Sequence, residues 1–363
     1  METTSRRRLY IVDMNCISPQ FTFDQSLFEH GSVDYVGNRY LAKEPAFGSI
    51  IPSGLLRRMG KAVRIGVGAG LPLINRNSGI DGIVLATANG GLEDCLKFLN
   101  QIVDYEEGTL TPTNFVQSTP NAVAGSLALM SNNTGYNITH VNKGLAFESA
   151  LLDVILLLSE GQASKVLLGG IEEISDYNYN IDLLAGSFKE EEVMSSNLLT
   201  SNTAGTVCGE GAAMFVISSE LVKDAFAEIV DTEQVSYPDK ETLFEKLNCF
   251  LVRNEMTPSQ IDTLVLGYSG DNRNDYWFDD VRESIFPSST VYSYKDLVGD
   301  YPTSSGFAMW FGVQVILGQN IPGRDTAVDR KAENVLVYNH YKGVQHGFVI
   351  LKAIGSHSFK MIP

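Results

Sequence analysis

The sequence predicts an α/β fold, in which buried strands alternate with buried helices along the chain. The clearest observation is the stretch 136–173, where a short β-branched strand, a helix of about four turns and a glycine-ended strand follow one another as one βαβ unit. Hydrophobic residues make up 44% of the chain and charged residues 19%, which allows a large core. The order of elements is similar in the two halves, which indicates a duplicated fold.

In the first half, strands are expected at 9–17, 81–88 and 205–217 and at both ends of the βαβ unit, from Tyr136 and from Lys165. Helices are expected at 92–105, from Pro120 onward, where Ser118 or Thr119 can cap the first turn, and at 145–160. Glycines and prolines are scattered through residues 21–80, so this segment is expected to be irregular. The run Lys189-Glu190-Glu191-Glu192 is expected to be a solvated charge cluster.

In the second half, strands are expected at 226–236, 262–268, 291–294, 334–340 and 347–352. Helices are expected at 240–254, 275–284 and 304–317, the first of them capped by Asp239. The strand that ends at residue 217 closes the first half. The chain is therefore divided into an N-terminal half, 1–217, and a C-terminal half, 218–363, within one integrated domain.

Charge and composition argue against several classes of function. The formal net charge of −16 disfavours nucleic acid and anionic membranes as partners. No apolar run approaches the roughly 20 residues that span a bilayer, and the run after Arg8 is too short for a signal peptide, so a cytoplasmic protein is expected. No metal, disulfide framework or cofactor is expected, because histidines number only five and the four cysteines are scattered, at Cys16, Cys95, Cys208 and Cys249.

Several stretches occur in an order that is typical of one enzyme family. They are the leading strand that ends Cys16-Ile17-Ser18-Pro19, Asn89-Gly90-Gly91-Leu92, Ser118-Thr119-Pro120-Asn121, Gly169-Gly170-Ile171-Glu172-Glu173, and Gly209-Glu210-Gly211-Ala212. This ordered set resembles the β-ketoacyl synthase family of the thiolase-like fold. The resemblance implies a five-layered αβαβα subunit with two pseudo-duplicated halves, and a dimer. Active members condense an acyl thioester, held on a cysteine, with malonyl on an acyl carrier protein.

The residues that carry this chemistry are missing from the matching positions. Alignment back from Gly169 places Gly144 at the nucleophile position, where a helix N-terminus would otherwise favour a thiolate. Gly267 or Tyr268 stands at the first family histidine and Asp300 at the second, while the lysine before it is retained as Lys295. The family's glycine-rich turn near the C-terminus becomes Asn339-His340-Tyr341-Lys342-Gly343-Val344-Gln345-His346-Gly347. These combined losses indicate a subunit that does not condense.

The first functional hypothesis is a subunit like the chain length factors of type II polyketide, aryl polyene or flexirubin systems. Such a subunit pairs with an active ketosynthase, reaches the acyl carrier protein through that partner and limits product length by shaping the shared tunnel. Phe115 and Phe147 are the candidate tunnel residues, and His140 is a candidate core or interface residue. Because carrier proteins are acidic, a chain at −16 is expected to leave carrier docking to the partner.

The alternatives are an acyltransferase or hydrolase with relocated catalytic residues, and a homodimeric acyl-binding protein. Ser149, Asp300 and His346 are the candidates for relocated chemistry on acyl thioesters. Lys295, His340 and His346, together with Asp300, are the candidates for a small polar site, although structural hydrogen bonding explains them equally simply.

Overall fold

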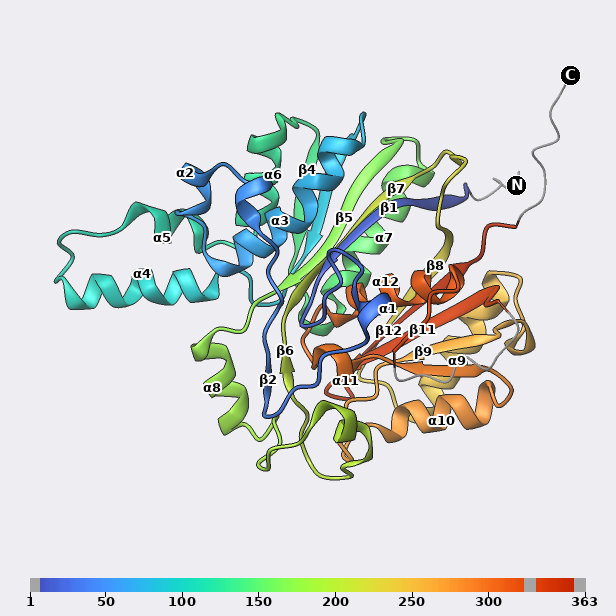
Figure 1. Ribbon diagram of the computed structural model, residues 1–363. Helices are drawn as coiled ribbons and strands as arrows, with labels where there is room; N and C mark the ends of the chain where they lie inside the picture. The colour runs from blue at the N-terminus through green and yellow to red at the C-terminus, as the bar shows by residue number, and fades with distance from the viewer. Residues whose placement is uncertain (1–6, 323–330, 356–363) are drawn as a thin grey trace, which may run out of the picture.

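A single mixed sheet forms the frame of the molecule (Figure 1). The computed structural model describes residues 7–322 and 331–355. The strands of the sheet follow the order β10-β9-β11-β12-β8-β1-β7-β5-β3-β4. Their bounds are β1 Leu9–Ile17, β3 Gly82–Ala86, β4 Tyr136–His140, β5 Lys165–Glu172, β7 Gly211–Ser218, β8 Ala227–Ser236, β9 Thr263–Leu266, β10 Thr290–Ser293, β11 Asn334–Tyr341 and β12 Gln345–Lys352. A separate short pair consists of β2 Arg39–Tyr40 and β6 Cys208–Gly209.

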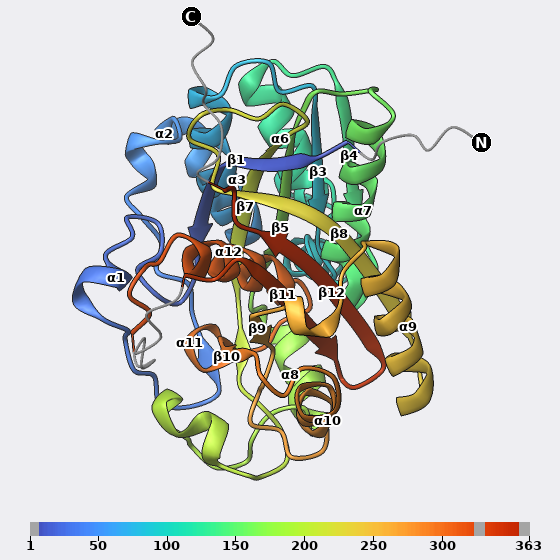
Figure 2. The same ribbon diagram turned by 90° about the vertical axis from the view of Figure 1, so that its right-hand side faces the viewer.

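The helices cover both faces of the two halves of this sheet. Their bounds are α1 Leu27–His30, α2 Ser53–Leu56, α3 Lys61–Arg76, α4 Leu92–Asp104, α5 Pro112–Gln117, α6 Ala122–Ser131, α7 Ala146–Ser159, α8 Asp176–Leu184, α9 Lys240–Arg253, α10 Tyr276–Ile285, α11 Lys295–Val298 and α12 Ser304–Ile316. In Figure 2, strands β3 and β4 lie above, β9 to β12 lie below, and β1 and β8 run between them.

Alternate residues of the strands face different cores, which defines the layers. Val84 of β3 and Val337 of β11 both belong to the central core, together with α7 and α12. Their neighbour Leu85 faces a second core with α3 and α6, and Leu336 faces a third core with α9 and α10. Helices α7 and α12 are therefore the middle layer of an αβαβα arrangement, as the predicted thiolase-like fold requires.

Helix α3 corrects the prediction that residues 21–80 are irregular. It spans 16 residues and most of them are buried. Its glycines lower the intrinsic preference for a helix, which is why the sequence did not predict it. In the tertiary structure these glycines allow close packing: a Cβ added at Gly66 would collide with Val123 of α6, and one at Gly68 would collide with Phe47. Tertiary packing has overridden the local preference.

Strand β4 and helix α7 are less buried than the sequence predicts. Strand β4 is an edge strand that pairs only with β3 among the described strands, and Tyr136 is 41% exposed. On α7, Leu152 and Leu156 are 40% and 50% exposed, although the rest of its apolar side chains are buried. Apolar residues in a sequence indicate that a surface is suited to apolar contacts. They do not indicate whether those contacts are made within the same chain or with another one.

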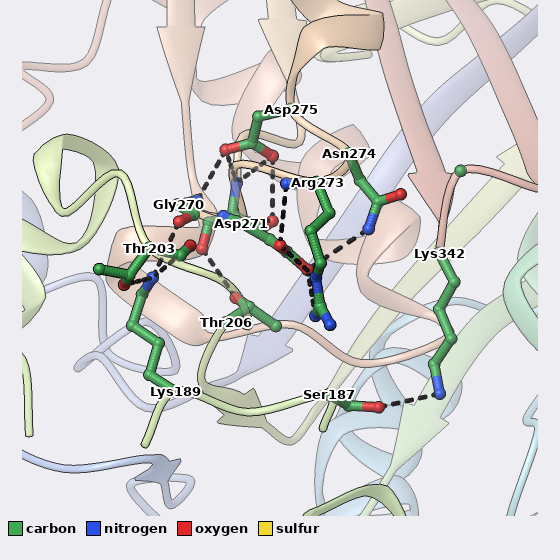
Figure 3. A network of polar contacts seen from close by, with 12 residues as sticks. Ser187, Lys189, Thr203, Thr206, Gly270, Asp271, Arg273, Asn274, Asp275 and Lys342 are labelled. Carbon is green, nitrogen blue, oxygen red and sulfur yellow. Dashed lines mark hydrogen bonds and ion pairs between the residues drawn. The ribbon is translucent and has the colours of Figure 1, made fainter. Parts of the chain in front are cut away.

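Lys189 was expected to be solvated and is buried instead. Its side chain is only 1% exposed, and Nζ donates hydrogen bonds to the carbonyl of Gly270 at 2.8 Å and to Oγ1 of Thr203 at 2.9 Å (Figure 3). Burial lowers the pKa of this ammonium group. The three glutamates that follow it are exposed, as predicted. The lysine therefore fastens the segment around residue 189 to the loop after β9.

Most of the remaining boundaries agree closely with the sequence-based ones, with two corrections. Helix α6 begins at Ala122 after Asn121 and has no side-chain cap, so neither Ser118 nor Thr119 caps it. The strand expected at 205–217 begins as β7 only at Gly211. Helix α9 begins where Asp239 was expected to cap it, and the Asp239 carboxylate accepts the backbone N–H of Thr242 at 2.8 Å. Within the described part of the chain, no helix combines the length and apolar character needed to cross a bilayer.

Candidate functional site

The turn that leads into α7 has no room for a nucleophile. Residues Lys143–Leu145 form a short 3-10 turn between β4 and α7, and Gly144 lies against the side chain of Tyr341 from β11. A Cβ built on Gly144 would come within 2.6 Å of the Tyr341 Cγ. The backbone N–H of Gly144 is also used, because it donates to Oε1 of Gln345 at 3.0 Å. Tyr341 and Gln345 thus close the position from the C-terminal half.

The position of the first family histidine is filled in a similar way. Gly267 follows β9, and a Cβ built there would collide with Oδ1 of Asn339 and lie 3.2 Å from Cε of Lys295. The amide of Asn339 is held from the other side, since its Nδ2 donates to Oγ of Ser305 at 3.2 Å. Asn339 therefore occupies the space from which a side chain at 267 would start.

The position of the second family histidine carries an ion pair. Asp300 Oδ1 lies 2.7 Å from Nζ of Lys295, and the two side chains are 22% and 1% exposed. The carboxylate of Asp300, paired with the retained Lys295, stands where the resemblance places an imidazole. The ion pair can orient a polar group that lies beside it, or neutralise the charge of that group. It does not offer the neutral hydrogen-bond donor that would stabilise an enolate or oxyanion.

A pocket of about 330 Å³ remains beside these positions. Its apolar wall is aromatic and includes Tyr179, Phe188, Tyr301 and Tyr341. Asp300, His340 and Cys208 also line it, so the pocket adjoins the ion pair described above. Its volume lies at the lower end of the range of about 300–1,000 Å³ that is usual for small-molecule sites.

Two ion pairs stand at the pocket wall, and Figure 3 shows the first of them, between Arg273 and Asp271. Arg273 donates from Nε and Nη2 to the two carboxylate oxygens of Asp271, at 2.8 and 2.7 Å. Lys342 Nζ lies 2.8 Å from Asp182 Oδ1 and donates to Oγ of Ser187 at 3.1 Å. Both cations that line the pocket are therefore matched by carboxylates that line it as well.

The two histidines near the degenerate turn are neutral structural residues. Nε2 of His340 donates to the carbonyl of Asn274 at 3.1 Å, and burial lowers the pKa of His340 well below its usual value. His346 exchanges a hydrogen bond with the Tyr338 hydroxyl at 2.9 Å, and burial lowers its pKa to about 4. Of the two, only His340 lines the pocket.

The proposed tunnel residues lie apart from one another. Phe115 is 59% exposed on α5, where its ring lies 5.2 Å from that of Phe98 of α4. Helices α4 and α5 project from the body (Figure 1). Phe147 is fully buried in the central core, against Phe215. His140 ends the edge strand β4 and pairs with Asp153 of α7 at 2.9 Å.

Ser149 is held by polar neighbours rather than by a base. Its Oγ donates to Oε1 of Gln234 at 3.1 Å and accepts from Nδ2 of Asn142 at 3.2 Å. Among the described residues, no hydrogen bond joins Ser149 to a histidine or to Asp300. The arrangement that would activate a serine is therefore absent from this part of the chain.

Sequence reasoning missed two buried carboxyl groups near the site. Glu148 of α7 is 1% exposed, lies against Gly347 of β12, and burial raises its pKa to about 7. Glu173, just after β5, is 7% exposed and lines the pocket, and burial raises its pKa to about 7 as well. The available signal was a glutamate inside an otherwise apolar segment, which marks a charged group with a specific environment.

Comparison with known proteins agrees with this geometry. Residues 39–193 match the sequence profile described as the N-terminal domain of β-ketoacyl synthase. This profile, which covers less than half of the chain, is of the family that the ordered motifs resemble. No curated protein sequence matches the chain.

Solved structures share the fold over nearly the whole chain. The ishigamide ketosynthase/chain length factor matches with a TM-score of 0.78 and 16% identity, over 96% of this chain and 100% of that one. A β-ketoacyl synthase from Burkholderia phymatum STM815 matches with a TM-score of 0.76 and 16% identity, with the same coverage. The ketosynthase ApeO in complex with its chain length factor ApeC, from Xenorhabdus doucetiae, gives a TM-score of 0.73 and 15% identity, over 96% of this chain and 98% of that one.

Proposed function

We propose that this chain is a non-condensing subunit that pairs with an active ketosynthase and shapes the acyl tunnel, as a chain length factor does. The biosynthesis served would be of the type II polyketide or fatty-acid kind. The observation that carries the proposal is the closed nucleophile turn, where Tyr341 packs on Gly144. A chain that keeps this fold without the nucleophile is suited to a function that depends on its shape and on its binding to another subunit.

The solved structures support this role by analogy. Two of the matching structures are described as a ketosynthase with a chain length factor, for ishigamide and for the ApeO–ApeC complex. At 15–16% identity these matches establish the fold, and the pairing of this chain with a ketosynthase remains our inference.

The surface around β4 fits a partner of the same fold. We call it the β4 face: the edge strand β4 with the exposed side chains of the elements beside it, namely Leu129 of α6 at 82%, Val141 at 52%, and Leu152 and Leu156 of α7 at 40% and 50%. Unpaired backbone groups on an edge strand, flanked by exposed apolar side chains, are typical of an interaction surface. In the proposed heterodimer the β4 face packs against the ketosynthase.

We assign the shaping of the acyl tunnel to Phe115, and the docking of the acyl carrier protein to the partner ketosynthase. Phe115 lies on the projecting α4–α5 arm, exposed at 59%, and is therefore free to contact a neighbouring subunit. Phe147 is a less direct candidate because it is fully buried in the central core. The net charge of −16 disfavours direct docking of an acidic carrier protein, so the ketosynthase supplies the docking surface.

The test is co-expression with an active ketosynthase from the same organism, followed by size-exclusion chromatography with light scattering. The proposal expects a stable 1:1 complex, and it expects Phe115→Ala and Phe115→Trp to change the chain length of the product without dissociating the complex. A chain that stays a monomer or homodimer in the presence of that ketosynthase contradicts the proposal. A covalent acyl adduct on Ser149, detected by mass spectrometry with an acyl thioester, would instead favour the relocated enzyme.

A further inference from the structure

The pocket beside the closed nucleophile turn carries an excess of acidic groups. Five carboxyl residues line it and only two cationic ones, Arg273 and Lys342. The carboxyl residues are Glu172, Glu173, Asp182, Asp271 and Asp300. Because burial keeps His340 neutral, that side chain adds no positive charge. Asp182, Asp271 and Asp300 are paired with Lys342, Arg273 and Lys295, so the acidic excess of the pocket comes from the two buried carboxyl groups of Glu172 and Glu173.

The two cationic residues are already matched by acids, so they are poorly placed to attract an anion. Arg273 is bound by both oxygens of Asp271, and Lys342 is bound by Asp182. An anionic ligand, such as a carboxylate or a phosphate, would have to displace one of these pairs. It would also enter against the remaining carboxylates.

Three of the acidic side chains keep an oxygen available to a ligand: Glu173, Asp300 and Asp182, whose hydrogen bonds with Lys342 and Ser187 both use Oδ1. Glu173 is 7% exposed, and its Oε2 accepts the backbone N–H of Ala62 at 3.0 Å, while its other oxygen has no partner among the described residues. Asp300 binds Lys295 through Oδ1 only, and its Oδ2 likewise has no partner in the described part of the chain. Burial, together with the nearby carboxyl groups of Asp94, Glu93 and Glu210, raises the pKa of Glu173 to about 7. A cation beside Glu173 would offset this electrostatic cost.

The rest of the wall favours an organic ligand over a metal ion. The described residues contain no group of three or more His, Cys, Asp or Glu that is arranged to hold a metal. The aromatic rings of Tyr179 and Phe188 are stacked 4.9 Å apart at the wall, and Tyr301 and Tyr341 line it as well. Aromatic faces attract cations and bury apolar groups. Arg39 already lies over the Tyr179 ring, 3.7 Å from its centroid, and Lys342 over the Tyr341 ring at 5.4 Å, so these rings mainly offer the ligand apolar surface.

We propose that this pocket binds a small amine with an apolar body, whose charge is balanced by the carboxylates of Glu173 and Asp300 and whose body packs on the tyrosines. The pocket thereby accepts a ligand of opposite charge to the 4′-phosphopantetheine arm of an acyl carrier protein, which carries an anionic phosphate at one end and a thiol at the other. This inference does not depend on the pairing with a ketosynthase proposed above.

The test uses three probes of nearly the same shape and different charge: 2-phenylethylamine, 2-phenylethanol and phenylacetate. Binding of each to the purified full chain is measured by isothermal titration calorimetry. We expect the amine to bind at least about tenfold more tightly than the alcohol, and phenylacetate to bind most weakly. We expect Glu173→Gln and Asp300→Asn each to weaken the amine by about tenfold and to leave the alcohol unchanged.

The matched control is Glu191→Gln, which makes the same change in net charge at an exposed residue that does not line the pocket. It should leave amine binding unchanged. The proposal is overturned if the amine does not bind, or if phenylacetate or 4′-phosphopantetheine binds as tightly as the amine. It is also overturned if neither pocket variant weakens the amine. If a variant folds poorly, the comparison of the three probes on the unaltered chain still tests whether the pocket prefers an amine. Complex formation with a ketosynthase is measured in a separate experiment.

Discussion

The side chain of Tyr341 lies over the Cα of Gly144, so that a Cβ at residue 144 would come within 2.6 Å of the Tyr341 ring carbon Cγ. The two residues are far apart in the sequence and come from opposite halves of the chain, α7's leading turn and strand β11. The absence of a side chain at 144 and the presence of a large one at 341 are therefore two parts of one packing arrangement.

A side chain at 144 should be tolerated only when Tyr341 is reduced. We expect Gly144→Ala to cost about 1–3 kcal/mol of unfolding free energy, because it overpacks the contact with Tyr341. In a Tyr341→Gly background the same change should cost about 1–2 kcal/mol less. Urea denaturation of the double-mutant cycle measures this coupling. Gly125→Ala in α6 is the matched control: open space surrounds it, and it should stabilise the chain by about 0.5–1 kcal/mol. If the losses of unfolding free energy in the two single variants simply add in the double variant, residues 144 and 341 are not packed against each other.

The loss of unfolding free energy on removing one partner of the Lys295–Asp300 pair should depend on which partner is removed. Asp300→Ala leaves a buried ammonium without a counter-ion and should cost about 3 kcal/mol of unfolding free energy. Lys295→Met should cost less, because Asp300 is 22% exposed and retains access to water. Denaturation at constant pH compares the two variants. Equal costs would show that the burial of Lys295 is not the decisive factor.

Glu148 should make the chain less stable as the pH rises from about 4.5 to about 7. Its pKa is raised in the folded state, so the folded chain holds a proton that the unfolded chain has lost in this window, and stability decreases with pH until the folded carboxyl has ionised. Glu148→Gln should remove this part of the slope and raise stability at pH 8 by an amount on the order of 3 kcal/mol. Thermal unfolding from pH 4.5 to 8 measures it, with the exposed Glu191→Gln as control. A slope that is unchanged in Glu148→Gln would contradict the prediction.

A charge on the β4 face should prevent pairing without unfolding the chain. Leu156→Glu places a carboxylate on the exposed apolar surface of α7 and should weaken the complex with a ketosynthase at least about tenfold. Val252→Glu on α9 is the control, because Val252 is 72% exposed and lies in the C-terminal half, away from this face. Light scattering of the mixed subunits gives the result. A complex that survives the first change and not the second would place the interface elsewhere.

The sequence predicted the strands and helices that carry strong periodicity or clear caps. Helix α9 with its Asp239 cap is an example, since both its apolar pattern and its capping residue are local signals. It did not predict α3, because glycines such as Gly66 lower helix preference and become favourable only where Val123 packs against them. It also misplaced Lys189, whose acceptors at Thr203 and Gly270 are distant in the chain.

For the site, the sequence by itself predicted which residues stand at the degenerate positions: Gly144, Gly267 or Tyr268, and Asp300. Ordered motifs were sufficient, because spacing along one chain fixes which residue follows which strand. Only the tertiary structure decided what fills those positions, namely Tyr341 over Gly144, Asn339 beside Gly267 and Lys295 paired with Asp300. The reason is physical: these contacts join the two halves of the chain, and packing between distant segments depends on volumes and charges that meet only after the sheet and its middle helices have assembled.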